Sequence, residues 1–346
     1  MNNFLEVYKL SKYFPVRSGL LKRKTGYVYA VDQISFSLKE GETLGLVGES
    51  GCGKSTAIRT ILNLLTPYSG KVFYKGKNIF DLPFEEMQNI RQNIQIIFQD
   101  PFGSLNPRMT VETIIEEPLS THRIGDRRSR REKIVKILET VGLLPEHMKR
   151  FPHEFSGGQR QRIMFARALI LKPKLIIADE PVSALDVSVQ AQMLNLLKKL
   201  QRELDLSYIF VSHDLGVVRH ISHKVAVMYL GEIVEIALVT DLYNSPRHPY
   251  TISLISSVPV LNPRMKDRKK SILKGDVPSP RNPPPGCRFH TRCPECMEIC
   301  RTQKPLARQI KENHIVSCHL FDDKELWIPR EPENDTQIQT MEMKEK

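Results

Sequence analysis

The chain has 346 residues, of which 40% are hydrophobic and 26% charged, and its formal net charge is +12. This composition is typical of a globular protein with one large and one small domain, and no apolar run of about 18 residues could cross a bilayer. The N-terminal residues lack the basic-then-apolar order of a signal peptide, which predicts a cytosolic chain. The positive charge fits nucleic acid, an anionic membrane surface or polyphosphate, but equally an ordinary solvated basic face.

The first motif along the chain that predicts a binding site is a glycine-rich loop. Residues 43–47 form a short apolar run, and a helical pattern follows the glycines, which predicts a strand, a loop and a helix. Gly48, Gly53, Lys54 and Ser55 fit the pattern G-x-x-x-x-G-K-[ST], in which backbone N–H groups hold phosphate, the lysine neutralises it and the hydroxyl binds Mg²⁺. Cys52 is interpreted as a small loop residue without a redox role. The expected ATP-binding segment is Gly48, Glu49, Ser50, Gly51, Cys52, Gly53, Lys54, Ser55 and Thr56.

A second glycine loop lies about a hundred residues further along, where residues 155–162 read FSGGQRQR. A serine and two glycines precede a segment in which Ile163, Ala166 and Leu169 recur at helical spacing. The N-terminus of a helix is itself a phosphate-binding element. One chain therefore carries two candidate phosphate sites.

Two acidic residues follow a buried strand. The apolar run at 175–178 is followed by Asp179 and Glu180. One carboxylate suits Mg²⁺, and its neighbour can orient or deprotonate an attacking water. A further strand at 208–211 precedes His213, and the carboxyl ends of such strands carry ligands.

The C-terminal third changes in composition. Residues 224–237 indicate a hairpin turning at Gly231–Glu232. After about Pro259 a basic and proline-rich linker is expected, and the last residues are polar enough to predict disorder. We expect an ATPase domain at 1–260, a small module at 261–329 and a disordered tail at 330–346.

Five cysteines lie in this small module. Disulfides are improbable in a reducing cytosol, and such a density favours metal binding over inert thiols. The Cys293-x-x-Cys296 spacing suits zinc, and an iron–sulfur cluster also needs only thiolates. His290 and His319 are nearby, but we expect them to be structural.

The motifs in this order resemble the ATP-binding cassette of ABC transporters. The matching stretches are GESGCGKST, FQD, FSGGQRQR, LIIADEP, SALD and VSH. The resemblance implies an α/β fold: a P-loop ABC nucleotide-binding domain with a RecA-like core, a helical subdomain at about 101–170, an antiparallel β subdomain and the small C-terminal cysteine-rich module. In this family two cassettes dimerise head to tail, and the second glycine loop covers the γ-phosphate bound by the other subunit. That explains why one chain carries two phosphate loops.

The resemblance also implies roles for single residues. Glu180 is the expected general base, Gln99 contacts Mg²⁺ and the attacking water, and His213 holds the γ-phosphate. Phe14 is the first choice to stack on adenine and Tyr13 the second, with Tyr27 and Tyr29 as rivals. The remaining expected residues are Lys54 at the phosphates, Ser55, Gln99 and Asp179 at Mg²⁺, Ser156, Gly157, Gly158 and Gln159 in the signature, and Asp186 at the dimer seam.

Three longer stretches narrow the resemblance. FQDPFGSLNPRMTV, LYNSPRHPYTISLISSVP and GCRFHTRCP are similar to the ATPase subunits of dipeptide/oligopeptide importers, and more to the second, F-type, of the two paired ATPases. Nickel and glutathione importers of the same family share much of this pattern. The family implies two permeases, a second and different ATPase, an extracytoplasmic peptide-binding protein, no nucleic acid, and a peripheral location on the cytoplasmic face of the inner membrane. Residues 101–150 are expected to meet the permease.

Relatives in this family have four cysteines in the module, and some hold a four-iron cluster there. The matching residues are Cys287, Cys293, Cys300 and Cys318, whereas Cys296 departs from the pattern and keeps zinc open. We rank a [4Fe-4S] cluster above Zn²⁺, beside the expected ATP and Mg²⁺. Two other functions stay open: a soluble ABC ATPase acting on nucleic acid or ribosomes, and a metal-sensing regulator.

Overall fold

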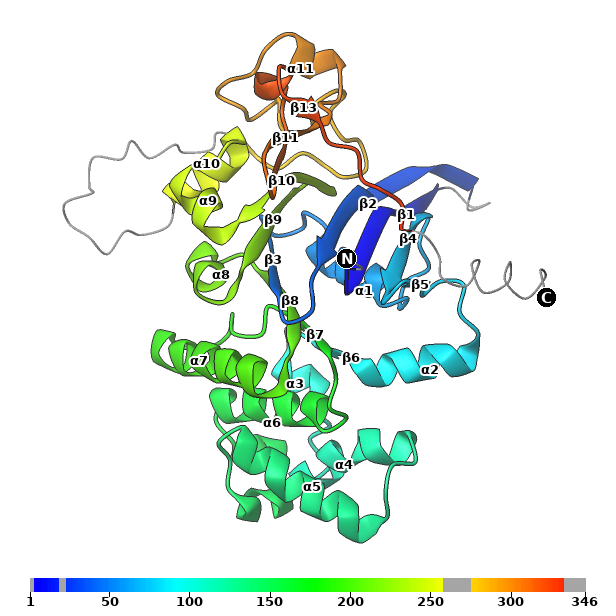
Figure 1. Ribbon diagram of the computed structural model, residues 1–346, viewed down its shortest axis with the longest axis vertical. Coiled ribbons are helices and arrows are strands. Elements are labelled where there is room, and N and C mark those ends of the chain that lie inside the picture. The colour runs from blue at the N-terminus through cyan, green and yellow to red at the C-terminus, as the bar shows by residue number, and fades with distance from the viewer. Residues whose placement is uncertain (1–2, 19–22, 258–274, 333–346) are drawn as a thin grey trace, which may run out of the picture. The chain divides into compact units, whose positions relative to one another are not determined.

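The computed structural model describes residues 3–18, 23–257 and 275–332 of the chain. The chain divides into two compact units, each with its own strands and helices (Figure 1). The first unit comprises Met1–Lys39, Leu44–Leu82 and His213–Lys346, and the second comprises Glu40–Thr43 and Pro83–Ser212.

The first unit contains an antiparallel sheet in the order β2-β1-β4-β5. Its two long strands pair from Leu5↔Leu38 to Ser18↔Arg23, with several register shifts. Leu5 and Val7 are buried while Glu6 between them is partly exposed, as the period of two along a strand requires. The strands are β1 (Leu5–Ser18), β2 (Arg23–Leu38), β4 (Ser69–Tyr74) and β5 (Lys77–Asn78).

A second set of strands in this unit lies in the order β13-β11-β12-β10-β9-β3. β3 and β9 run parallel and every residue of both is buried, as is typical of parallel strands covered on both faces. This confirms the strand predicted at 43–47. The strands are β3 (Thr43–Val47), β9 (Lys224–Tyr229), β10 (Glu232–Leu238), β11 (Ala307–Lys311), β12 (His314–Ser317) and β13 (Glu325–Leu326).

The predicted hairpin between β9 and β10 exists, but its turn is one residue earlier than expected. Tyr229 pairs with Glu232, and Leu230 and Gly231 form the turn with φ of 44° and 87°. Both central residues of such a two-residue turn need positive φ, and glycine adopts it readily.

The C-terminal module continues this set of strands. β12 pairs with β10 through Glu235↔Val316 and Ile236↔Ile315, and β11 follows β12. The proline-rich stretch in the first part of the module also contacts an earlier strand, because Tyr29 N donates to Pro280 O over 2.9 Å. The basic run at 266–270 and most of the expected tail, 333–346, lie outside the described residues.

Short helices complete the first unit, and they connect its strands. Among them α1 is the next element after β3, and α10 begins with a proline at its first position, where a missing N–H costs nothing. The helices are α1 (Lys54–Ile61), α8 (Leu215–Ile221), α9 (Val239–Asn244), α10 (Pro249–Ser256), α11 (Ile299–Thr302) and the 3₁₀ turn η4 (His319–Phe321).

The second unit contains three parallel strands in the order β8-β7-β6, and the strands predicted at 175–178 and 208–211 are confirmed. α7 buries Met193, Leu197 and Leu200 at helical spacing. The elements are α2 (Phe84–Asn93), β6 (Ile94–Ile97), α3 (Pro101–Ser104), α4 (Val111–Thr121), α5 (Arg127–Thr140), η1 (Pro145–Lys149), η2 (Pro152–Glu154), α6 (Gly157–Leu169), β7 (Leu175–Asp179), α7 (Val187–Leu204) and β8 (Ser207–Ser212).

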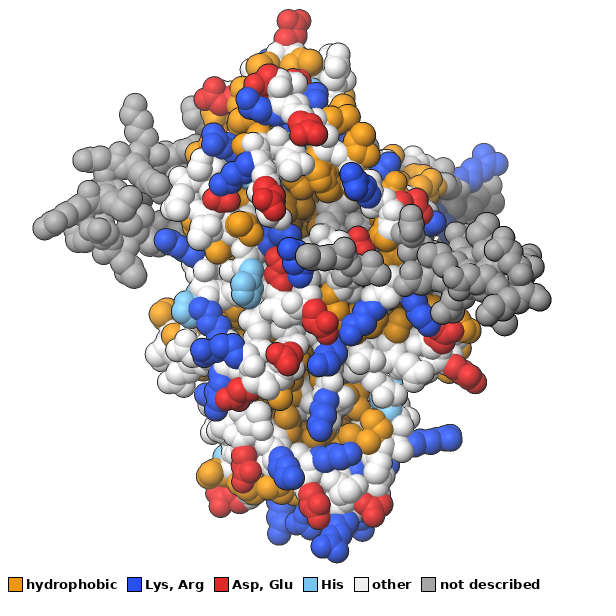
Figure 2. Space-filling view, in the orientation of Figure 1, with side chains coloured by type: hydrophobic (Ala, Val, Ile, Leu, Met, Phe, Trp, Pro, Cys, Tyr) orange, Lys and Arg blue, Asp and Glu red, His pale blue; other side chains and the backbone are white. Residues whose placement is uncertain are grey.

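The surface carries charges of both signs. Figure 2 shows acidic and basic side chains interspersed over the visible face. On α5, Arg128 and Arg131 are well exposed, and their nearest acidic partners are Glu132 and Glu112 at 3.4 and 3.8 Å. Within the described residues no helix has the length and apolar character needed to cross a bilayer.

Candidate active site

The phosphate loop lies between β3 and α1, where two glycines pack against neighbouring backbone. A Cβ on Gly48 would lie 2.2 Å from Met228 O, and a Cβ on Gly53 would lie 2.1 Å from Ala30 O. Both glycines have positive φ, of 156° and 109°. Any larger residue would have to displace β9 or β2, so the close packing of the loop requires glycine at both positions.

Lys54 holds a positive charge under this loop. Its side chain is buried, and Nζ donates to Gly48 O over 2.7 Å and to Glu49 O over 3.0 Å. Nζ also donates to Cys52 Sγ over 3.8 Å. Because sulfur is a weak acceptor, a phosphate oxygen can replace it as the partner of this third donor. Gly53 precedes α1 without a side-chain cap. The first N–H groups of α1 therefore have the arrangement that binds an anion at a helix N-terminus.

A residue that the sequence analysis did not single out supports the same loop. Tyr250 is fully buried in α10, and its hydroxyl accepts a hydrogen bond of 2.9 Å from Glu49 N. His248 caps α10, because its Nδ1 accepts from Tyr250 N over 3.1 Å. Both residues belong to the stretch SPRHPYT, which the sequence analysis used only as a family resemblance.

In the second unit, the acidic pair ends β7. Asp179 is 2% exposed, and Glu180 follows it with φ of 48°. That left-handed conformation is uncommon for a residue with a side chain. Glu180 N donates to Val211 O over 3.0 Å, and Gln99 Nε2 donates to Glu180 Oε2 over 3.1 Å. The structure therefore brings Gln99 and Glu180 together although 81 positions separate them.

The signature loop forms the N-terminus of α6. Ser156 Oγ accepts from Gln159 N over 3.3 Å, and Gln159 Oε1 accepts from Ser156 N over 3.0 Å, which is a reciprocal capping box. Ser156 and Gly157 are exposed, while a Cβ on Gly158 would lie 2.4 Å from Val189 Cγ1. The side chains of Ser156 and Gln159 thus build the start of the helix. Gly157 leaves it exposed, and the close packing against Val189 requires glycine at position 158.

Asp186 begins the next helix of this unit. Its side chain accepts from Val189 N over 2.9 Å and from Ser188 Oγ over 2.7 Å, which caps α7. The hydrogen bond from Val189 lowers the pKa of Asp186 below its ordinary value. Val189 also contacts Gly158, so the signature loop and Asp186 meet at one residue. His213 is exposed directly after β8.

Comparison with known proteins identifies these elements. The ABC transporter family matches residues 31–183, and the oligopeptide/dipeptide transporter C-terminal region matches residues 234–300. The oligopeptide transport ATP-binding protein AppF of Bacillus subtilis is 56% identical over 319 residues, which cover 92% of this chain and 97% of the relative. The chain belongs to the ABC transporter ATP-binding proteins.

Two further comparisons agree with this membership. The oligopeptide transport ATP-binding protein OppF of Salmonella typhimurium is 50% identical over 322 residues, 92% of this ABC protein and 96% of the relative. The ATP-binding cassette MJ0796, solved as a dimer in a post-hydrolysis state with ADP and Pi, has a TM-score of 0.60 and 30% identity over 68% of this chain and 98% of its own. The expected fold class and ATP hydrolase activity are therefore confirmed, and an ATPase acting on nucleic acid or ribosomes is not favoured.

The aromatic candidates for adenine differ in their surroundings in this ABC protein. Tyr13 OH donates to Asp32 Oδ1 over 2.6 Å, and burial together with this bond raises the pKa of Tyr13 to about 12. Its ring packs with Tyr29, Tyr27 and Tyr68, at centroid distances of 4.8, 6.1 and 4.4 Å. Phe14 lies outside this cluster and is 37% exposed.

The cysteines of the module are close to one another but do not form a defined metal site. All six cysteines of the chain are described and are free thiols. Burial raises the pKa of Cys287 to about 12 and those of Cys293 and Cys318 to about 11, and neighbouring thiols, Cys300 among them, contribute. No three His, Cys, Asp or Glu side chains in the described part of the chain could hold a metal ion. Thiols are the donor type that an iron–sulfur cluster or zinc requires.

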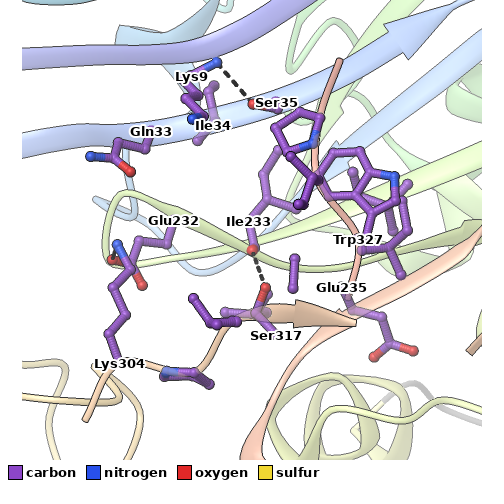
Figure 3. Close-up of a pocket in the computed structure, with 18 of the residues that line it drawn as sticks. Lys9, Gln33, Ile34, Ser35, Glu232, Ile233, Glu235, Lys304, Ser317 and Trp327 are labelled. Carbon is purple, nitrogen blue, oxygen red and sulfur yellow. Dashed lines mark hydrogen bonds and ion pairs between the residues drawn. The ribbon is translucent and has the colours of Figure 1, made fainter. Parts of the chain in front are cut away.

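A separate cavity of about 360 Å³ lies in the first unit beside β10 and β12 (Figure 3). Its wall includes Trp327 and Ile233. Among its charged lining residues, Lys304 Nζ contacts Glu232 over 2.5 Å and Asp32 over 3.5 Å. None of its lining residues belongs to the phosphate loop. The cavity is therefore distinct from the candidate active site.

Proposed function

We propose that this ABC ATPase is the subunit that powers import of di- and oligopeptides through a membrane permease. The observation that carries the proposal is the coexistence in one chain of a packed phosphate loop and a capped, exposed signature loop. The match to the oligopeptide/dipeptide transporter C-terminal region supports the peptide substrate. In this proposal residues 1–260 form the ATPase domain, 261–329 the C-terminal module, and the helical subdomain at 101–170 faces the permease.

The proposed reaction is ATP hydrolysis between two cassettes. A water molecule attacks the γ-phosphorus in line with the bond to ADP, that P–O bond breaks, and Glu180 accepts the proton of the water. Gln99 holds the Glu180 carboxylate, and His213 contacts the γ-phosphate. Ser55, Gln99 and Asp179 would hold Mg²⁺, which supplies positive charge to the phosphate oxygens.

The second half of each site comes from the partner. Ser156, Gly157, Gly158 and Gln159 present a helix N-terminus to the γ-phosphate bound by the other subunit, and Asp186 lies at the seam. ATP then favours the closed dimer, and hydrolysis reopens it. We propose a heterodimer with a second ABC ATPase, two permeases and an extracytoplasmic peptide-binding protein, with this subunit peripheral at the cytoplasmic face of the inner membrane.

Copurification and uptake test this function. A tagged chain from membranes solubilised in mild detergent should bring down two hydrophobic permeases and a second cassette. Recovery of RNA or DNA in place of permeases would contradict the proposal. A strain that lacks this chain should lose uptake of a labelled tripeptide, and the wild-type gene should restore it. Loss of nickel or glutathione uptake with normal tripeptide uptake would assign one of those substrates instead.

We also propose that Cys287, Cys293, Cys300 and Cys318 bind a four-iron cluster, with zinc as the alternative and Cys296 as a possible replacement ligand. The mutual proximity of the thiols and their suitability as ligands support this proposal. Protein purified without oxygen should absorb broadly near about 400 nm, because charge transfer from thiolate to iron does not occur at zinc. A colourless protein that contains zinc would exclude the cluster, and one without either metal would exclude both.

A further inference from the structure

Three segments that are far apart in the sequence meet at Glu49 of the phosphate loop. Tyr250 lies 201 positions away and accepts the hydrogen bond of the Glu49 amide. Arg292 lies 243 positions away, in the cysteine module, and its guanidinium donates two hydrogen bonds to the Glu49 carboxylate, of 2.7 and 3.1 Å. All three residues belong to the first unit.

The ion pair between Arg292 and Glu49 has the geometry of a strong interaction. Its two parallel contacts form the two-point pairing that arginine makes with carboxylates, and such pairs fix orientation as well as distance. The Arg292 side chain is 6% exposed and the Glu49 side chain 28% exposed, so water screens the pair only in part. The guanidinium carbon also lies 6.0 Å from the centre of the Tyr229 ring.

A tight turn at residues 287–293 sets the position of Arg292. Arg292 N donates to Phe289 O over 3.0 Å, and Cys287 N donates to Cys300 O over 2.8 Å. Gly286 precedes the turn with φ of 65°, and a Cβ there would lie 2.5 Å from Cys300 O. The place of Arg292 therefore depends on how the cysteine module is folded around it.

Two other residues attach this turn to the strands around the phosphate loop. Arg288 donates to Leu230 O over 2.5 Å and pairs with Asp32 and Glu232. Phe289 is 1% exposed and packs between the rings of Tyr229 and Tyr250, at 5.2 and 5.4 Å. The ring that Phe289 contacts on α10 is the same ring whose hydroxyl holds the loop.

A movement of Glu49 would also move Lys54, the lysine expected to bind phosphate, because the two residues are joined by a hydrogen bond. Glu49 O and Gly48 O are the two oxygen acceptors that hold Lys54 Nζ, and Cys52 Sγ is its third, weaker partner. Glu49 is fixed at its amide by Tyr250 and at its carboxylate by Arg292. We propose that Arg292 is a positioning residue for the phosphate loop, and that through it the cysteine module sets the affinity of this ATPase for nucleotide. The proposal rests on ATP binding at the phosphate loop and does not depend on the transported solute.

The test is a measurement of KM and kcat for ATP in the assembled transporter. Arg292→Ala should raise KM about tenfold, because the Glu49 carboxylate loses the group that fixes it, and should change kcat less than about twofold. Arg292→Lys should give an intermediate KM, since it keeps the charge and loses the two-point contact. The double variant Glu49→Ala/Arg292→Ala should bind ATP no more weakly than Arg292→Ala alone.

A matched control separates positioning from general stability. Arg308 lies in the same module and pairs with Asp322 over 3.4 Å, away from the phosphate loop, so Arg308→Ala should leave KM for ATP unchanged. A wild-type KM in folded Arg292→Ala would overturn the proposal, as would an equal rise of KM in Arg308→Ala. If Arg292→Ala does not fold, a wild-type KM in Arg292→Lys overturns it. Failure of the wild-type complex to hydrolyse ATP would instead refute the proposed function.

Discussion

Gln99 Nε2 donates a hydrogen bond of 3.1 Å to Glu180 Oε2, which joins the end of β7 to the segment that follows β6. The contact orients the carboxylate of a residue whose backbone is in the uncommon left-handed conformation. A carboxylate fixed in this way suits a general base, because its direction does not change between catalytic cycles.

Replacing Glu180 by glutamine should therefore abolish turnover and preserve binding. The amide has the same shape and keeps the contact with Gln99, but it cannot accept a proton. We expect kcat to fall at least about 100-fold while the Kd for ATP changes less than about twofold. Steady-state hydrolysis and equilibrium binding of labelled ATP measure the two quantities. Glu203→Gln, an exposed residue on α7, is the control, and near-normal hydrolysis in Glu180→Gln would remove Glu180 from its role.

A large residue at Gly158 should prevent closure of the dimer without affecting the phosphate loop of the same chain. A Cβ at this position would lie 2.4 Å from Val189 Cγ1, so a leucine side chain would displace the start of α6 from α7 and change the signature loop. Gly158→Leu should retain binding of ATP to the isolated chain and lose ATP-dependent association with the second cassette. Light scattering with and without ATP measures the association. Gly26→Ala is the control because nothing lies within 4 Å of its added Cβ.

The aromatic residue that stacks on adenine can be identified by two substitutions. Phe14→Ala should raise KM for ATP about tenfold, since an exposed ring is lost from the stacking position. Tyr13→Phe should leave KM nearly unchanged, because it removes only the hydroxyl that donates to Asp32. Loss of this hydrogen bond should instead lower the midpoint of unfolding in urea. The opposite result, a weak effect at Phe14 and a strong one at Tyr13, would assign the role to the Tyr13 cluster.

Stability should fall at acidic pH because of His248. Burial lowers its pKa from 6.5 to about 4, against the opposing charge of Glu235, and its Nδ1 must stay unprotonated to accept from Tyr250 N. The unfolded chain therefore binds more protons between pH 6.5 and 4. The stability present above pH 6.5 is lost as the pH falls through this window, by up to about 3 kcal/mol.

Urea unfolding at several pH values measures this loss. His248→Asn keeps a side-chain acceptor for the helix cap and does not titrate, so its stability should depend less steeply on pH than that of the wild type. Glu235 is the charged group next to His248, because its Oε2 accepts a hydrogen bond from His248 N. Glu235 Oε1 in turn lies 2.8 Å from His314 Nε2. Equal slopes for both proteins would show that these neighbours, and not His248, cause the pH dependence.

The phosphate loop, the acidic pair and the signature loop could be predicted because each is local in the sequence. In the phosphate loop and the signature loop, phosphate chemistry needs neighbouring backbone N–H groups, which forces glycines into short fixed spacings. The strands beside these motifs could also be predicted. Because β3, β7 and β8 are buried on both faces, their sequences are largely continuous apolar runs. The predicted turn between β9 and β10 is one residue too late. The predicted pair, Gly231–Glu232, and the observed pair, Leu230–Gly231, both contain the glycine on which the prediction depends.

The sequence by itself thus determined the family, the ATPase chemistry and the residues most expected to carry it. Only the tertiary structure decided which distant residues support them. Tyr250 and Arg292 have no local pattern that points to Glu49, because their contacts exist only once strands and helices from opposite ends of the chain have packed. For the same reason the sequence does not predict that the hairpin of the C-terminal module pairs with β10. The two are joined by backbone hydrogen bonds, which do not depend on a particular side chain.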